Sequence, residues 1–204
     1  MIRLLLVVTL AMLPLWVQAK GVLVLGDSIS AAYGIEKNAG WVALLEAELE
    51  QRCRDIPVIN ASVSGETTAG GNSRLPPLLE KHAPDIVIIE LGGNDGLRGL
   101  SPIAMAENLR SMIDASRAAG ATPLLLGMRI PPNYGQQYTR LFEQQFHQVS
   151  DDKDVPLFPF FLEGVVEKGW LQEDGIHPTA EAQPLLKNHA ISVLDPMLPS
   201  RCQL

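Results

Sequence analysis

Short apolar runs alternate along this chain with longer stretches in which apolar residues recur at helical spacing. The runs are rich in Val, Ile and Leu, which is typical of buried parallel strands. They predict five strands, at residues 22–25, 58–61, 86–90, 123–127 and 155–158. Strands that alternate with helices, without an internal repeat, indicate βαβ units. We therefore expect an α/β fold in which a five-stranded parallel sheet is covered by helices in a three-layer α/β/α domain.

The stretches between the runs predict the covering helices. Helical spacing is followed by Trp41, Leu44, Leu45 and Leu49, by Met105, Leu109, Met112 and Ile113, and by Ala182, Leu185, Leu186, Ala190, Val193 and Leu194. Ser101-Pro102 is a good helix start, and the last helix is expected to open at Thr179. Pro184 either bends that helix or is tolerated as a proline of its first turns.

The first 19 residues have the pattern of a secretory signal. Arg3 is their one charged residue, an apolar core runs over 4–17, and Val17-Gln18-Ala19 supplies a cleavage site. The alternative is an uncleaved membrane anchor, but the apolar stretch is about 14 residues, against about 20 needed to span a bilayer. We expect a signal peptide at 1–19, a single domain over 20–204, and a periplasmic or secreted protein without stable membrane insertion after cleavage.

The charge balance bears on the partners of the protein. The chain carries 16 Lys and Arg against 23 Asp and Glu, a formal net charge of -7. Binding to nucleic acid or to anionic lipid headgroups needs clustered cations. We therefore expect a small-molecule substrate and no nucleic acid. A monomer is expected as well, although nothing in the charge balance determines the oligomeric state.

Cys53 and Cys202 are the two cysteines of the chain. Export would permit a disulfide that ties the C-terminal tail to the region after the first helix, and the alternative is two free thiols. Two cysteines are too few for a structural zinc site. We expect neither a metal nor an organic cofactor.

Three short blocks carry candidate chemistry: Gly26-Asp27-Ser28, Gly92-Gly93-Asn94 and Asp174-Gly175-Ile176-His177. The first two each end a predicted strand, and open α/β sheets bind ligands at the carboxyl ends of strands. A serine hydroxyl is a weak nucleophile that needs a base. His177 can take its proton and return it to the leaving group, while Asp174 holds the other ring nitrogen. The blocks predict a catalytic triad of Ser28, His177 and Asp174.

The blocks resemble those of the SGNH, or GDSL, hydrolases, named for Ser, Gly, Asn and His, here Ser28, Gly65, Asn94 and His177. The stretches at 90–99, 131–135 and 155–161 extend the resemblance. It implies a flavodoxin-like fold and a serine hydrolase that cleaves fatty acyl thioesters and oxygen esters, with acyl-CoA thioesterase, lysophospholipase and arylesterase activities. It also implies an oxyanion hole made of the backbone N–H groups of Ser28 and Gly65 and the Asn94 amide, each contributing about 3 kcal/mol.

The resemblance further implies a groove for the acyl chain. Its predicted lining residues are Arg129, Ile130, Pro131, Tyr134, Phe142, Phe160, Phe161 and Ile176. Such a groove would gain about 0.8 kcal/mol for each methylene it buries. The alternative is that the aromatic residues belong to the core. The resemblance also implies a mobile loop at 72–80, which the paired Pro76-Pro77 would stiffen.

Other interpretations stay open at this point. An esterase for short acyl groups, such as acetylated sugars, would share the blocks, and a catalytically silent lipid-binding module would keep the fold. Asp27 and Asp95 are expected to cap turns and brace loops rather than transfer protons. His82 and His147 are expected in solvent, and His189 in packing.

Overall fold

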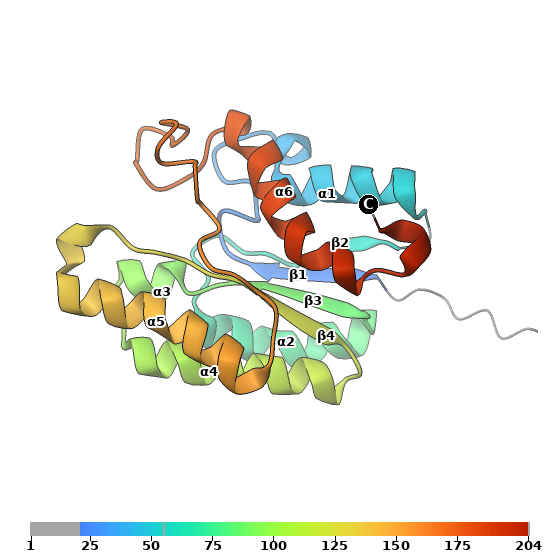
Figure 1. Cartoon of the computed structure of the whole chain (residues 1–204), viewed down its shortest axis with the longest axis horizontal. Helices are drawn as coiled ribbons and strands as arrows, with labels where there is room; N and C mark the ends of the chain where they lie inside the picture. The colour runs from blue at the N-terminus through green and yellow to red at the C-terminus, as the bar shows by residue number, and fades with distance from the viewer. Residues whose placement is uncertain (1–20, 55, 204) are drawn as a thin grey trace, which may run out of the picture.

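Five parallel strands form the middle layer of the molecule, in the order β2-β1-β3-β4-β5. The computed structural model describes residues 21–54 and 56–203, so the predicted signal peptide lies outside the described residues. The strands are β1 (Val22–Gly26), β2 (Val58–Asn60), β3 (Ile86–Glu90), β4 (Thr122–Leu126) and β5 (Leu157–Phe158) (Figure 1). This order is that of flavodoxin-like sheets. The predicted five-stranded parallel sheet is confirmed.

The strands lie where the apolar runs predict them, with small shifts at their ends. Strands β1 and β3 are buried along their whole length, as expected of central strands covered on both faces. The largest shift is in β5, which begins at Leu157 rather than at residue 155. Pro156 has no N–H to donate to the sheet, and the N–H of Val155 bonds to the Ser150 carbonyl instead.

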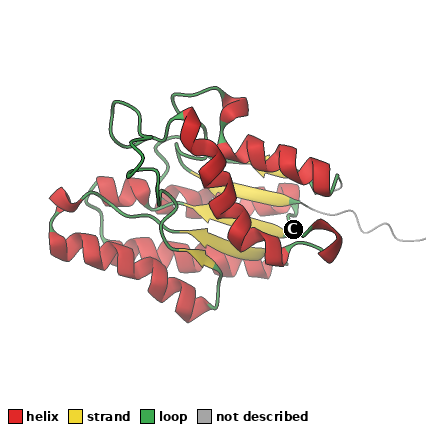
Figure 2. Cartoon of the chain, turned by 45° about the horizontal axis from the view of Figure 1, so that its top comes forward, coloured by secondary structure: helices red, strands yellow, loops and turns green. Residues whose placement is uncertain are grey.

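Helices cover both faces of the sheet. Helices α1 (Trp41–Arg52) and α6 (Gln183–Leu194) pack together over one face, whereas α2 (Thr68–His82), α4 (Pro102–Ala118) and α5 (Gln136–Lys153) form the layer on the other (Figures 1 and 2). The short helix α3 (Gly93–Leu97) follows β3 directly. The predicted three-layer architecture is confirmed. Among the helices of the described residues, none combines the length and the apolar character needed to cross a membrane.

Single turns of 3-10 helix complete the secondary structure of the described residues. They are η1 (Lys37–Ala39), η2 (Pro132–Tyr134), η3 (Ala180–Ala182), η4 (Asp195–Met197) and η5 (Ser200–Cys202).

The predicted start at Ser101-Pro102 agrees with the structure, whereas α6 begins four residues after the predicted Thr179. The hydroxyl of Ser101 accepts a hydrogen bond from the N–H of Ala104 and caps α4, with Pro102 as its first residue. At the last helix, Thr179 precedes the turn η3, and α6 then begins at Gln183. Pro184 lies in the first turn of α6, where a missing N–H costs little, so the helix runs on to Leu194.

The segment at 72–80 is helical and lies within α2, so the expectation of a loop there is wrong. Pro76 and Pro77 stand inside the helix, where each removes a backbone hydrogen bond. Both prolines are exposed, whereas Leu75 and Leu79 of the same helix are 0 % and 5 % exposed. Burial of the leucines outweighs the lost hydrogen bonds, and the helix forms against its local propensity.

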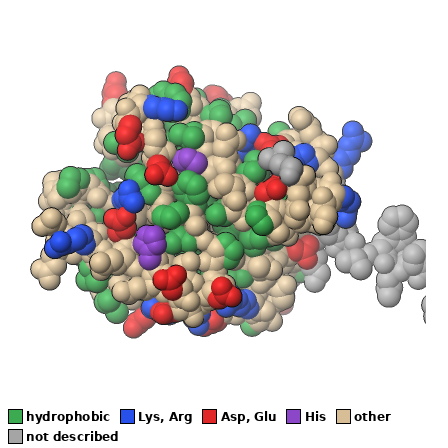
Figure 3. Space-filling view, in the orientation of Figure 1, with side chains coloured by type: hydrophobic (Ala, Val, Ile, Leu, Met, Phe, Trp, Pro, Cys, Tyr) green, Lys and Arg blue, Asp and Glu red, His purple; other side chains and the backbone are tan. Residues whose placement is uncertain are grey.

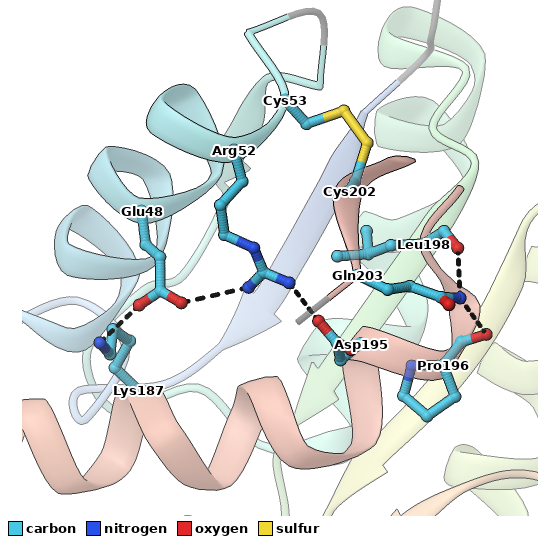
Figure 4. A network of polar contacts seen from close by, with 9 residues as sticks. All are labelled: Glu48, Arg52, Cys53, Lys187, Asp195, Pro196, Leu198, Cys202 and Gln203. Atoms are coloured by element: carbon cyan, nitrogen blue, oxygen red, sulfur yellow. Dashed lines mark hydrogen bonds and ion pairs between the residues drawn. A yellow bond between two sulfur atoms is a disulfide. The ribbon is translucent and has the colours of Figure 1, made fainter. Parts of the chain in front are cut away.

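A disulfide joins Cys53 at the end of α1 to Cys202 in the C-terminal tail (Figure 4). Their Cα atoms are 5.4 Å apart, although 149 positions separate them in the sequence. The described structure therefore has the crosslink rather than two free thiols.

An ion-pair cluster lies beside this disulfide. Arg52 pairs with Glu48 of the same helix and with Asp195, and Lys187 of α6 pairs with the other oxygen of Glu48 at 2.6 Å (Figure 4). The cluster ties α1 to α6 at the end of the sheet where the strands begin.

The carboxyl ends of β1 and β3 form the topological switch point of the sheet. After β1 the chain crosses to β2 on one side, and β3 then lies on the other side of β1. The register pairs Gly26 of β1 with Glu90 of β3, so the residues that follow both strands emerge side by side. This is where open α/β sheets bind ligands.

Candidate active site

Ser28 lies in the turn that follows β1. The N–H of Ile29 donates to Oδ1 of Asp27 at 3.0 Å, and the N–H of Ala31 donates to the Asp27 carbonyl. Asp27 therefore shapes the turn on both sides of the serine, which confirms its predicted role as a cap. Ser28 itself is 8 % exposed.

The His177 ring bridges Ser28 and Asp174. Its Nε2 lies 2.8 Å from Oγ of Ser28, and its Nδ1 lies 2.6 Å from Oδ2 of Asp174. These contacts are those of a nucleophile, a base and a group that orients the base. Ser28 and His177 are 149 positions apart in the sequence, so only the fold brings them together.

Asp174 is held in its charged form. Its Oδ1 accepts the backbone N–H groups of Ile176 at 2.9 Å and His177 at 3.0 Å. The hydrogen bond from the His177 ring, together with these backbone hydrogen bonds, lowers the pKa of Asp174 from 3.8 to about 2. At neutral pH the carboxylate can hold a proton on Nδ1, which leaves Nε2 to accept the serine proton.

Two residues that the sequence patterns did not single out hold the His177 loop against the Ser28 turn. The side-chain amide of Gln172 donates to the carbonyls of Tyr33 at 2.9 Å and Pro178 at 3.0 Å. The Tyr33 ring lies against the His177 ring, with centroids 4.4 Å apart. Tyr33 follows Ser28 closely in the sequence, and this short separation is a signal that could have placed it near the site. Nothing in the sequence points to Gln172, because both of its partners are backbone carbonyls and that of Tyr33 lies 139 positions away.

Asn94 lies in α3, directly after β3, and faces the Ser28 turn. Its Nδ2 donates to Oδ2 of Asp27 at 3.0 Å, which leaves the second amide hydrogen for another acceptor. Burial raises the pKa of Asp27 from 3.8 to about 6, although hydrogen bonds from Ile29 and Asn94 act in the opposite direction. Asp27 thus connects the first two blocks through one buried carboxyl group.

Gly65 lies in the loop after β2, beside the same sheet edge. The N–H of Val63 donates to the Gly26 carbonyl at 3.1 Å, which places this loop next to the end of β1. Gly65 has a φ of +79°, a conformation that L side chains rarely adopt. Its carbonyl accepts a hydrogen bond from Arg98 at 2.8 Å. The loops that carry Ser28 and Gly65 therefore meet the helix that carries Asn94 at one edge of the sheet, where His177 reaches Ser28.

Four of the predicted groove residues are exposed: Arg129, Pro131, Tyr134 and Ile176. The Tyr134 hydroxyl donates to the Leu97 carbonyl at 2.9 Å and so attaches its loop to the end of α3. Ile176 is 39 % exposed and directly precedes His177. Contact between these residues and a substrate stays a prediction.

Phe142 is fully buried and supports the site from behind. Its ring packs edge-on against Phe146 at 5.6 Å between centroids. It also lies so close to Gly96 of α3 that a Cβ there would be 2.8 Å from the ring, and Ile130 packs at the same glycine. The structure favours the core alternative for Phe142, because this ring supports the helix that carries Asn94.

Phe161 also belongs to the core, whereas Phe160 is half-buried. Phe161 packs edge-on against Trp41, with centroids 5.2 Å apart, and is 0 % exposed. Phe160 lies under the guanidinium group of Arg129 at 4.9 Å, and Arg129 pairs with Glu143 at 2.7 Å. Phe160 and Arg129 are therefore both accessible to a substrate at the surface. Phe161 is buried and could contact a substrate only if the structure rearranged.

The remaining polar predictions have mixed outcomes. Asp95 is buried and accepts hydrogen bonds from the N–H and the hydroxyl of Thr68, so it braces α2 against α3 as expected. His189 stacks on Phe158 at 4.3 Å and contacts the Phe161 carbonyl, which confirms its packing role. His147 is exposed, while His82 is half-buried at the end of α2.

Within 21–54 and 56–203, no group of three or more His, Cys, Asp or Glu side chains is arranged to hold a metal ion.

A doubly wound parallel sheet with a serine, a histidine and an aspartate in contact at its switch point defines a serine ester hydrolase. The chain belongs to the GDSL-like lipase/acylhydrolase family, whose profile matches residues 24–184.

The chain is similar to several proteins that are named as esterases or thioesterases. The chain is 50% identical over 181 residues to Esterase TesA of Pseudomonas aeruginosa, covering 88% of this chain and 90% of that protein. It is 43% identical to Thioesterase 1/protease 1/lysophospholipase L1 of Escherichia coli, covering 88% and 86%. The crystal structure of the psychrotrophic esterase EstA from Pseudoalteromonas sp., inhibited by monoethylphosphonate, matches with a TM-score of 0.82 at 41% identity, covering 87% of this chain and 98% of that one.

Proposed function

We propose that this protein hydrolyses thioesters and oxygen esters of fatty acyl groups through an acyl-Ser28 intermediate. The observation that carries the proposal is the chain of contacts from Ser28 Oγ through the His177 ring to Asp174. The similarity to an esterase and to a thioesterase and lysophospholipase supports the substrate class.

Acylation begins with Ser28 in contact with its base. As Oγ attacks the acyl carbon, its proton moves to Nε2 of His177, and the carbonyl oxygen becomes an oxyanion. The Asp174 carboxylate stabilises the resulting imidazolium and fixes its orientation. When the tetrahedral intermediate collapses, the bond to the leaving thiol or alcohol breaks, and His177 donates the proton to that group.

Deacylation repeats these steps with water as the nucleophile. His177 takes a proton from the water as it attacks the acyl carbon, and returns it to Oγ of Ser28 when the fatty acid leaves. The enzyme is regenerated without any oxidation or reduction.

The oxyanion is stabilised by donors from two loops and from helix α3. The proposed donors are the backbone N–H groups of Ser28 and Gly65 and the free N–H of the Asn94 amide, whose other N–H is anchored on Asp27. The left-handed backbone of Gly65 and the absence of a Cβ support a close approach to the substrate.

The length of the preferred acyl chain depends on the surface beside Ser28. Exposed apolar groups at Tyr134, Ile176 and the half-buried Phe160 support an acyl-binding surface. Phe142 and Phe161 are fully buried, so two of the predicted lining residues are not accessible to an acyl chain. That observation is the reason to test a second candidate, an esterase for short acyl groups, beside the fatty acyl enzyme.

Export belongs to the same proposal. The secretory pattern of 1–19 supports removal of this segment and a periplasmic or secreted location, and the Cys53–Cys202 disulfide suits an oxidising compartment. Acidic and basic side chains are interspersed on the face shown in Figure 3. Nucleic acid binding needs clustered cations. This mixed surface and the net charge of -7 therefore support a small-molecule substrate and not a nucleic acid.

The test combines active-site labelling with turnover. A fluorophosphonate should label the purified mature protein once, at Ser28, as measured by intact mass and peptide mapping. Ser28→Ala should take no label and lose several orders of magnitude in kcat on p-nitrophenyl esters. The matched control is Ser192→Ala, which removes an exposed hydroxyl on α6 and should behave like the parent.

The outcomes separate the candidate functions. Rates that rise from acetyl to longer acyl esters support the fatty acyl enzyme, and rates that fall steadily with length support the short-acyl esterase. A parent protein that takes no label, with the same low turnover as Ser28→Ala, would show a silent lipid-binding module and overturn the proposal.

A further inference from the structure

Glu90, the last residue of β3, is a buried acidic side chain that the triad does not use. It is 0 % exposed and pairs in register with Gly26 at the end of β1. Its Oε2 accepts hydrogen bonds from the Ser30 hydroxyl at 2.6 Å and from the Asp27 backbone N–H at 3.3 Å. Its Oε1 is buried and has no hydrogen-bond partner.

The two groups that Glu90 binds lie on either side of Ser28. Asp27 precedes the nucleophile and Ser30 follows it, so one carboxyl oxygen spans the turn. The Ser30 hydroxyl also accepts a hydrogen bond from the indole N–H of Trp41 at 3.2 Å. Trp41 is fully buried at the start of α1, so the turn is attached both to β3 and to a helix on one face of the sheet.

The end of β1 is shaped to admit this carboxyl group. A Cβ at Gly26 would lie 2.7 Å from Oε2 of Glu90 and 2.6 Å from the Ser30 hydroxyl oxygen. Real Cβ atoms do not approach so closely, so any larger residue at 26 would displace the network. The glycine of the first block is therefore needed for Glu90 as well as for the turn.

Keeping a carboxyl group in this place is unfavourable for folding. Full burial, with the adjacent Asp27 carboxylate as a second cause, raises the pKa of Glu90 well above its usual value. An apolar residue of similar size would avoid both the burial of the acid and the unpaired Oε1. The contact between Glu90 and the turn therefore suggests a role in the reaction.

We propose that Glu90 is a positioning residue that holds the Asp27–Ser30 turn by its Oε2, so that the hydroxyl and the backbone N–H of Ser28 keep the geometry needed for attack and for oxyanion binding. The inference rests on the proposed function, because it assigns Glu90 to the nucleophile of that reaction. Glu90 touches neither the substrate nor His177. It acts through the turn.

The test compares two substitutions at Glu90. Glu90→Gln keeps an acceptor for Ser30 and Asp27 without a charge, and it should retain most of the parental kcat. Glu90→Leu removes the acceptor, and its kcat should fall by about 10- to 100-fold, with KM little changed, because a displaced nucleophile slows chemistry more than binding. The rate of fluorophosphonate labelling at Ser28 should fall in parallel.

A second pair of variants keeps the test decisive if Glu90→Leu does not fold. Ser30→Ala and Ser116→Ala each remove one buried hydroxyl, and Ser116 lies in α4, where it bonds to the Met112 carbonyl. Ser30→Ala should lower kcat and the labelling rate, whereas Ser116→Ala should change the melting temperature alone.

The outcomes distinguish this inference from the proposed function. If Ser28→Ala is inactive while folded Glu90→Leu and Ser30→Ala keep the parental kcat and labelling rate, Glu90 is merely structural and the inference is wrong. If the kcat of Glu90→Gln is as low as that of Glu90→Leu, the hydrogen bonds accepted by Oε2 do not position the turn, and the inference is wrong in that case too. If Ser28→Ala retains activity, the proposed function fails first.

Discussion

At the carboxyl end of the sheet, Asp27, Ser30 and Glu90 are buried around the turn that carries Ser28. At the opposite end, Glu48 and Arg52 form ion pairs within reach of solvent, beside the disulfide (Figure 4). Both ends contain polar groups close to the ends of strands and helices. They differ in whether those groups keep access to water and to a partner of opposite charge.

This difference appears in how each end contributes to stability. The folded state raises the pKa of Asp27 to about 6, so it binds a proton more tightly than the unfolded chain. Asp27 therefore lowers the free energy of unfolding as pH rises from about 4 to about 6, and the buried Glu90 acts in the same direction. The opposite end has paired charges and a crosslink, both of which favour the folded state. Changes at the first end should alter turnover, and changes at the second should alter stability.

The largest effect on turnover in this comparison is expected for Asp174→Asn. The variant should lower kcat about 10⁴-fold, because an amide no longer holds the proton on Nδ1 of His177. The rate should be measured on a p-nitrophenyl ester, with the melting temperature as a check on folding. Glu173→Gln alters an exposed carboxylate in the same loop and should leave kcat unchanged. A kcat for Asp174→Asn within tenfold of the parent would contradict the orienting role.

A smaller loss of turnover is expected for Asn94→Ala. Removal of one oxyanion donor should lower kcat by about 10²- to 10³-fold with little change in KM. The variant also removes a hydrogen bond to buried Asp27, so the free energy of unfolding should fall as well. Denaturant unfolding would measure that loss separately from the kinetics. An unchanged kcat would show that Asn94 only braces the turn.

No change in turnover is expected when both cysteines are replaced. The double variant Cys53→Ala, Cys202→Ala should lose about 2–5 kcal/mol in the free energy of unfolding, because the disulfide closes most of the chain into one loop. Urea unfolding of the parent and the variant would measure this difference. If kcat at 25 °C fell together with stability, the two ends of the sheet would be coupled, and the contrast between them would not hold.

Much of the fold could be predicted because its signals are local. Val, Ile and Leu runs mark strands wherever both faces of a sheet are covered, and β3 lies where its run predicts it, Ile86–Glu90. The failures have equally physical causes. The resemblance predicts a loop at 72–80, yet burial of Leu75 and Leu79 maintains a helix there in spite of its two prolines. The rings of Phe142 and Phe161 suit a groove or a core equally well in sequence, and only their 0 % exposure distinguishes the two.

The sequence by itself determined the class of fold and the chemical groups at the site, because strand patterns, strand-end glycines and the short Asp174 to His177 spacing are properties of neighbouring residues. The tertiary structure decided that Ser28 meets His177 across 149 positions, that Gln172 holds their loops together, and that Glu90 lies beneath the nucleophile's turn. These features depend on contact between distant segments and on exclusion of water. Both arise only when the whole sheet and its helices pack.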